Sequence, residues 1–185
     1  GEVLYLSGAG ATVVEVDLTG GGIPAETALV TAGTVQALVD PLMVGPAPIL
    51  SGICVLDADH LLVMEHSYNV VLLVSRSVPD TVTLFAGVPN AVPGLADGPA
   101  SLARFSFGAP AQLVATGTGE VLVADSGNHV LRRIRDGFAG TLVGGGTAFF
   151  ADGDLMASYL DTPSGLSVDC AGRVLVTELG LGLAG

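Results

Sequence analysis

Three acidic residues stand at the same place in three similar segments of the chain, directly after a short apolar run. They are Glu65, Asp125 and Glu178, and Ser7 holds this place in the opening segment. A ring of carboxylates from several segments would suit a hard cation such as Ca²⁺, which prefers oxygen ligands. The alternative is structural, because a carboxylate at a strand end can accept hydrogen bonds from backbone N–H groups of the next turn. Both interpretations stay open.

Further polar residues follow these acids or lie in two glycine-containing segments. We assign to one binding face His66, Asn128, His129, Asp97, Asp152 and Asp154. The alternative for Asn128-His129 is that both hold a hairpin together through side-chain hydrogen bonds. Asp97-Gly98 and Asp152-Gly153 favour turns. We expect Arg104 to form an exposed salt bridge to Asp97, which would contribute about 0–1 kcal/mol.

The usual catalytic motifs are missing from the sequence. It has no Gly-x-Ser-x-Gly, no His-Glu-x-x-His, no Cys-x-x-Cys, and no lysine for a phosphate-binding loop. A metal-dependent hydrolase or lyase would need three or four ligands from different segments. Because only His66 and His129 fall on the expected face, the sequence favours a non-catalytic protein.

The segments that position these residues repeat along the chain. Lining up Tyr5, Val63, Val123 and Val176 gives offsets of 58, 60 and 53 residues. A long period built of short apolar strands is typical of a β-propeller, in which one small sheet recurs around an axis. The predicted fold class is therefore all-β, a β-propeller of four-stranded antiparallel blades.

Apolar runs and turn residues predict the strands of each copy. The second copy should hold strands at residues 53–56, 61–65, 70–74 and 82–86, and the third at 111–115, 121–125, 129–135 and 140–143. The opening copy should hold strands at 3–6, 13–17 and 28–31, and the closing copy at 165–168 and 174–177.

These strands divide the chain into a partial blade at 1–48, blades at 49–108 and 109–161, and a partial blade at 162–185. About 13 strands make a partial propeller of about 3–4 blades, whereas most propellers have four to eight. Unpaired edges would invite pairing with another chain. We therefore expect either missing flanking sequence or blades supplied by a partner.

Up-and-down connection within a blade sorts the loops onto two faces. Turns between second and third strands share one face with the linkers between blades. That face carries the acids, His66 and His129, and the long linkers at residues 88–108 and 144–161. His60 falls on the opposite face.

Several motifs recur in a fixed order. Gly119–Asp125 is followed by Asn128–Ile134, and Pro163–Asp169 starts a copy. Leu84–Gly87, Ala96–Gly98 and Ala103–Phe105 form the tail of a copy. These motifs resemble the NHL-repeat family of β-propellers over about residues 50–178, although Tyr68-Asn69 stands where the third copy has Asn128-His129. The resemblance implies a propeller with a binding role, but no single activity.

The amino-acid composition argues against nucleic acids and membranes as partners. Of 185 residues, 50% are hydrophobic, and 27 glycines and 10 prolines suit many short strands and turns. A net charge of −12 argues against binding to nucleic acid, RNA included, and to anionic membranes. No apolar run approaches the roughly 18 residues that span a bilayer, so we expect no membrane span.

The few basic and sulfur-bearing residues have structural interpretations. Arg132, Arg133 and Arg135 share one strand, and we expect solvation and pairing with nearby acids. Cys54 and Cys170 fall in different layers, two blades apart, so we expect no disulfide between them. No signal-peptide pattern is visible, and the chain has the pattern of a piece of a longer protein.

The leading hypothesis is a non-catalytic interaction or scaffold module of a larger protein. It would bind a protein, a peptide or another part of the same polypeptide through the face with the linkers. Partly apolar linkers without convergent ionisable groups would support it. No cofactor is predicted, unless the acids hold a divalent cation. Two competing hypotheses are a metal-dependent propeller hydrolase or lyase and a structural repeat in a large assembly.

Overall fold

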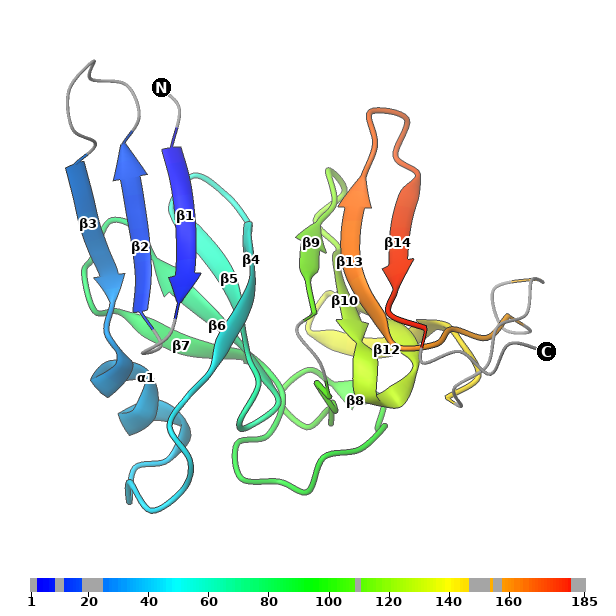
Figure 1. Cartoon of the computed structure of the whole chain (residues 1–185), viewed down its shortest axis with the longest axis horizontal. Coiled ribbons are helices and arrows are strands. Elements are labelled where there is room, and N and C mark those ends of the chain that lie inside the picture. The colour runs from blue at the N-terminus through cyan, green and yellow to red at the C-terminus, as the bar shows by residue number, and fades with distance from the viewer. Residues whose placement is uncertain are drawn as a thin grey trace.

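The computed structural model describes residues 3–8, 12–17, 25–108, 111–146, 154 and 158–180. These residues form four antiparallel sheets that follow one another along the chain (Figure 1). The prediction of an all-β fold is confirmed. Asp152, one of the predicted binding-face residues, lies outside the described residues.

The second sheet has four strands in the order β4-β5-β6-β7, each antiparallel to the next. They are β4 (Leu50–Val55), β5 (His60–Glu65), β6 (Val70–Ser75) and β7 (Val82–Ala86). All four strands predicted in this copy are found, and β7 agrees with its prediction residue for residue. Local apolar runs and turn residues are therefore sufficient to locate this sheet.

The third sheet has the order β9-β10-β11-β12-β8. Its strands are β9 (Leu113–Ala115), β10 (Val121–Asp125), β11 (Val130–Arg135), β12 (Phe138–Val143) and β8 (Gly98–Pro99). β8 corrects the prediction of a simple turn at Asp97-Gly98, because Gly98 and Pro99 pair with the start of β12. The side chain of Asp97 accepts hydrogen bonds from Thr141 on β12, which holds this part of the linker against the sheet.

The described parts of the other two sheets are smaller. The first sheet contains β1 (Val3–Gly8), β2 (Thr12–Asp17) and β3 (Ala25–Val30). The fourth contains β13 (Pro163–Val168) and β14 (Val174–Glu178). Of these strands, β1, β2, β13 and β14 begin within two residues of the predicted starts, whereas β3 begins three residues before its predicted start at residue 28.

The helix α1 (Ala32–Val39) was not predicted. Thr31 caps its start, where the hydroxyl oxygen accepts a hydrogen bond from the Thr34 amide at 3.4 Å. Pro41 follows its end and cannot continue the helical hydrogen bonds. Val35 and Val39 are fully buried and join the core between the first and second sheets.

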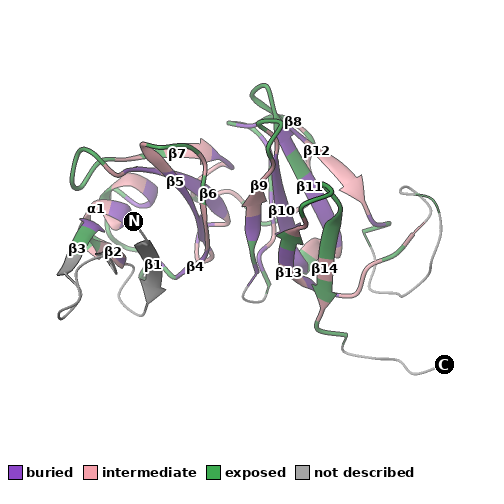
Figure 2. Ribbon diagram, turned by 90° about the horizontal axis from the view of Figure 1, so that it is seen from above, coloured by how far each residue is buried: buried purple, intermediate pink, exposed green. Residues whose placement is uncertain are grey.

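The sheets pack face to face, with β1 beside β4, β4 beside β9 and β9 beside β13. Side chains of β5 enter cores on both faces of the second sheet. Leu61 and Val63 pack toward the first sheet and α1, and Leu62 and Met64 pack toward the third sheet. Figure 2 shows the resulting buried strands in the middle of the molecule. Burial on both faces explains why β5 is a continuous apolar run.

No helix in the described ranges is long and apolar enough to cross a membrane. Both cysteines are free. Burial raises the pKa of the Cys54 thiol to about 11, which makes it a poor nucleophile at neutral pH.

Candidate functional site

The face that carries the linkers is called the linker face below. In Figure 1 it is the lower edge of the molecule, where α1, the first linker (residues 40–49) and the second linker (residues 88–108) lie. The turn between β13 and β14 lies at the opposite edge.

The three carboxylates at the ends of β5, β10 and β14 share one structural role. Each accepts a hydrogen bond of 2.8 Å from a backbone N–H of the segment that leads into its own sheet. Glu65 binds the amide of Ile49, Asp125 that of Ser106, and Glu178 that of Asp161. Glu65 also accepts from the amides of the following turn, as the structural interpretation predicted. These acids anchor the linkers to the sheets.

Two of these carboxylates are fully buried. Burial raises the pKa of Glu65, while hydrogen bonds from three backbone amides oppose the rise. Burial likewise raises the pKa of Asp125 to about 6, against hydrogen bonds from Asn128, Ser106 and Arg132. Their oxygens are occupied by donors from the protein. In the part of the chain that the structure covers, no three His, Cys, Asp or Glu residues form a group that could hold a metal ion.

Arg132 does not lie on a solvated surface, which corrects its prediction. Its side chain is fully buried, and it donates to Asp125 at 3.0 Å and to Asp97 at 2.9 Å. It also donates to the carbonyl oxygens of Arg104 and Ala96 and lies 4.8 Å over the ring of Phe105. The second linker folds across β11 and supplies all of these partners except Asp125, which ends β10.

Arg133 and Arg135 agree with the prediction for the basic cluster. Both are about half exposed, and both face Glu120, at 3.9 and 2.9 Å. The predicted pair between Arg104 and Asp97 is wrong, because Asp97 is held by Arg132 and Thr141 instead. Arg104 is exposed.

Asn128 and His129 reach beyond their own hairpin. Asn128 donates to Asp125, as a hairpin role predicts, and also to the carbonyl oxygen of Gly94 in the second linker. The ring nitrogen Nδ1 of His129 accepts a hydrogen bond from the Thr162 amide at 3.1 Å. His129 thus contacts the start of the fourth sheet, 33 residues along the chain.

The other predicted binding-face residues differ in their environment. His66 is half-buried against Phe107, with ring centres 5.9 Å apart, and burial lowers its pKa. Within the described residues its buried Nε2 atom has no hydrogen-bond partner. Asp154 is exposed, and its carbonyl oxygen accepts from the Ser158 amide.

The linker face also presents apolar side chains, which the sequence did not single out. Leu42, Met43 and Val44 form a tip on the first linker and are 80%, 63% and 83% exposed. On the second linker, Val92 is 75% exposed. The amide of Asn90 donates to the carbonyl oxygen of Val39, which places the second linker beside the end of α1.

The apolar tip is held by a buried carboxylate at its base. Asp40 is 4% exposed and accepts hydrogen bonds from the Gly45 amide, the Tyr68 hydroxyl and the Gln36 amide. The hydrogen bond from Gly45 is the main cause that lowers the pKa of Asp40. The same Tyr68 hydroxyl lies 2.9 Å from the carbonyl oxygen of Pro46 and 3.2 Å from Asp40, so its one proton is shared between acceptors at the two ends of the turn. The tip is therefore exposed and anchored at once.

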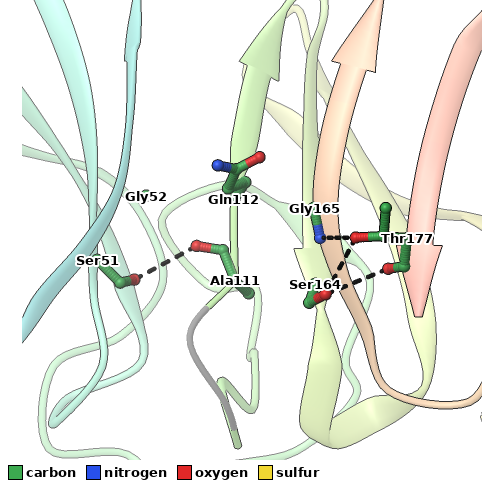
Figure 3. Close-up of a pocket in the computed structure, with 7 residues that line it drawn as sticks. All are labelled: Ser51, Gly52, Ala111, Gln112, Ser164, Gly165 and Thr177. Carbon is green, nitrogen blue, oxygen red and sulfur yellow. Dashed lines mark hydrogen bonds between the residues drawn. The ribbon is translucent and has the colours of Figure 1, made fainter. Parts of the chain in front are cut away.

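A second feature is a hollow of about 350 Å³ between β4, the start of β9 and the hairpin of β13 and β14, called the hub pocket here. It is lined by neutral residues, namely Ser51, Gly52, Ala111, Gln112, Ser164, Gly165 and Thr177 (Figure 3). The amide oxygen of Gln112 accepts from the Leu166 backbone at 3.1 Å. In Figure 3 the amide nitrogen of Gln112 points the other way, toward the side of Gly52.

The hub pocket could have been found from the repeat. Ser51-Gly52, Ala111-Gln112 and Ser164-Gly165 occupy one register, at or just before the first strand of three successive copies. Because β4 lies beside β9 and β9 beside β13, residues that share this register come close together. Sequence reasoning from charged and metal-binding side chains missed these small neutral ones.

No protein-family model matches this chain, and no curated protein matches it. Solved structures do resemble it. An auxiliary nutrient binding protein from Bacteroides thetaiotaomicron matches with a TM-score of 0.66 at 19% identity, over 94% of this chain and 42% of that chain. A protein of unknown function from the same organism matches with a TM-score of 0.61 at 16% identity, over 95% of this chain and 54% of that chain.

This chain therefore spans about half or less of the length of those two proteins. At such low identity the likeness concerns the fold alone. It extends over nearly all of this chain, so the succession of sheets described above also occurs in crystal structures of longer proteins.

Proposed function

We propose that the four sheets are successive blades of an NHL-like β-propeller and that the chain is a non-catalytic module that binds a protein or peptide through the linker face. The sheet succession supports the propeller, because β1 lies beside β4, β4 beside β9 and β9 beside β13. Backbone hydrogen bonding between neighbours, such as the Gln112 amide to the Ser164 carbonyl at 2.8 Å, supports it as well.

The observation that carries the binding role is the apolar tip Leu42-Met43-Val44. Exposed apolar side chains in contiguous groups mark interaction sites, whereas scattered ones are ordinary. Here three consecutive side chains are exposed on a turn that the buried Asp40 and Tyr68 hold in place. An anchored turn loses little conformational entropy on binding, so more of its apolar contact contributes to affinity.

Three charged side chains of the same face support the same conclusion, whereas Asp97, Arg104 and Asp154 are exposed. Glu65, Asp125 and Arg132 are fully buried, and their hydrogen bonds anchor the linkers. They hold the linker face in shape but present little charge to a partner. Apolar contact from the tip then fits an extended apolar peptide or the apolar patch of a protein.

Peptide selection tests this role. Peptides selected from a displayed random library on the wild-type chain should bind with micromolar affinity, and the double variant Leu42→Ser/Val44→Ser should weaken them about tenfold or more. Affinities would be measured by isothermal titration. The matched control is Val55→Ser, which removes a 48% exposed valine from the far end of β4. Selected peptides that bind the double variant and the wild type equally would contradict the proposal.

A second candidate function is favoured by the hub pocket. Its volume falls in the range of small-ligand sites, and its lining offers hydroxyl and amide groups but no charge. Such a lining suits a neutral, hydroxyl-rich molecule. One structural neighbour is described as a nutrient binding protein, which agrees with a small-molecule ligand without naming it.

Neutral saccharides are suitable probes of the hub pocket. Ligand-detected NMR with a set of neutral mono- and disaccharides should reveal at least one binder that Gln112→Glu weakens about tenfold. Glutamate keeps the oxygen that the Leu166 amide contacts but loses the amide donor. The uronic acid of the same sugar should bind more weakly than the neutral form. Absence of any binder from the set, or binding that Gln112→Glu leaves unchanged, would contradict this candidate.

A further inference from the structure

Asn69 and His129 occupy equivalent places in the second and third sheets. Each lies four residues after the carboxylate of its sheet, Glu65 or Asp125, and directly before the third strand. Both have a left-handed backbone, with φ of 55° and 56°. The sequences of the two turns differ, but the backbone places both side chains in the same direction.

Both side chains accept a hydrogen bond from a backbone N–H in the segment that leads into the next sheet. The amide of Phe107 donates to Oδ1 of Asn69 at 2.6 Å. The amide of Thr162 donates to Nδ1 of His129 at 3.1 Å. One contact therefore links the second sheet to the third, and the other links the third sheet to the fourth.

The two acceptors differ in their chemistry. An amide oxygen accepts a hydrogen bond at any pH, whereas an imidazole nitrogen accepts only when it carries no proton. Histidine is the side chain whose charge ordinarily changes between about pH 5 and 8. The hydrogen bond from Phe107 to Asn69 therefore does not depend on pH. The hydrogen bond from Thr162 to His129 forms only when Nδ1 carries no proton.

A neighbouring carboxylate can accept a hydrogen bond from His129 once the ring is protonated. Oδ1 of Asp161 lies 3.8 Å from Nδ1 of His129. Once protonated, that nitrogen can donate to Asp161 but can no longer accept from Thr162. Among the described residues, the charged groups on the elements around His129 are Asp161 on the linker, Glu178 at the end of β14, Asp125 at the end of β10 and the arginines of β11. Arg132 is paired with Asp125, and Arg133 and Arg135 face Glu120, so the charged group that the structure places next to the His129 ring is Asp161.

We propose that His129 is a proton-sensitive latch between the third and fourth sheets, and that Asn69 is its proton-insensitive counterpart between the second and third. Thr162 directly precedes β13, whose Ser164 and Gly165 form one wall of the hub pocket. Release of the Thr162 amide therefore loosens that wall. The latch goes beyond the proposed binding role and does not depend on it.

Amide hydrogen exchange measured by NMR tests the latch. From pH 8 to pH 5, protection of the Thr162 amide, corrected for intrinsic exchange, should fall about tenfold, the effect of one lost hydrogen bond. Protection of the Phe107 amide in the same molecule should change by less than about twofold. The conservative variant His129→Asn, which copies the second sheet, should keep Thr162 protected at both pH values.

The reciprocal variant Asn69→His gives an independent measurement. It should make the Phe107 amide sensitive to pH and leave Thr162 as in the wild type. If Thr162 and Phe107 lose protection in parallel in the wild type, the latch is refuted. It is also refuted if His129→Asn responds to pH as the wild type does. If neither variant folds, the wild-type comparison of the two amides still decides.

Discussion

Replacement of Arg132 by methionine is expected to lower the free energy of unfolding by about 3–5 kcal/mol, the cost of leaving a buried charge without its partner. The variant would leave Asp125 fully buried without its guanidinium and would remove one hydrogen bond each from Asp97, which Thr141 still holds, and from two linker carbonyl oxygens. Methionine has a similar length and apolar character, so loss of volume contributes little. Since the chain has no tryptophan, urea unfolding would be followed by far-UV circular dichroism.

Arg133→Met is the matched control. Arg133 is the next residue on the same strand, but its side chain is 49% exposed. Its replacement should change the free energy of unfolding by no more than about 0.5 kcal/mol. If the two variants lose equal stability, the buried network does not hold the second linker.

The cost of Arg132→Met should also depend on pH. The guanidinium stabilises the fold through Asp125 only while that carboxyl is ionised, that is, above its pKa of about 6. Below this pH the carboxyl of Asp125 takes up a proton in the folded state and no longer needs a cation. The difference in unfolding free energy between wild type and variant should therefore be larger at pH 8 than at pH 5.

Gly144→Ala is expected to cost about 3 kcal/mol, because backbone strain and a steric clash add together. Gly144 follows β12 with φ of +107°, a conformation that L side chains rarely adopt. A Cβ there would lie 2.6 Å from the carbonyl oxygen of His129 and 3.0 Å from Cα of Val130, both backbone atoms. Gly87 holds the same place after β7, where a Cβ would lie 2.9 Å from the carbonyl oxygen of Asn69.

Two other glycines separate the cost of backbone strain from the cost of the steric clash. Gly137 has φ of +74° with no atom near the site of a Cβ, so Gly137→Ala reports strain alone, about 1–2 kcal/mol. Gly117 has neither a positive φ nor a close neighbour, so Gly117→Ala should be neutral or stabilise by up to about 1 kcal/mol. Thermal unfolding of the three variants would rank them. A Gly144→Ala variant no weaker than Gly137→Ala would disprove the close approach.

The sheets could be predicted from sequence because each strand depends on local signals. β7 and β10 have the predicted bounds, since a run of apolar residues ends at turn residues on either side. The role of Glu65 as an acceptor for its own turn was also predicted, because its partners lie two and three residues away. The helix α1 was missed. It is eight residues long, and only its cap and the following proline mark it.

The candidate site depended on contacts between distant residues, and these had no local signal. Arg132 has the pattern of an outer-strand arginine, but the second linker folds over it and supplies Ala96, Asp97 and Arg104 as partners. The exposure of Leu42, Met43 and Val44 depends on hydrogen bonds of Asp40 to Tyr68, 28 residues away.

The sequence by itself determined the positions of the strands other than β8, their grouping into successive sheets and the lack of the usual catalytic motifs in the chain, because these follow from short-range pattern. The tertiary structure alone decided which polar side chains are available to a partner. In the sequence, Arg132 and Arg133 cannot be told apart as binding residues, because both are arginines of one strand. The second linker covers Arg132 alone. A buried charge needs partners inside the protein, so Arg132 forms internal hydrogen bonds and is not available to a binding partner.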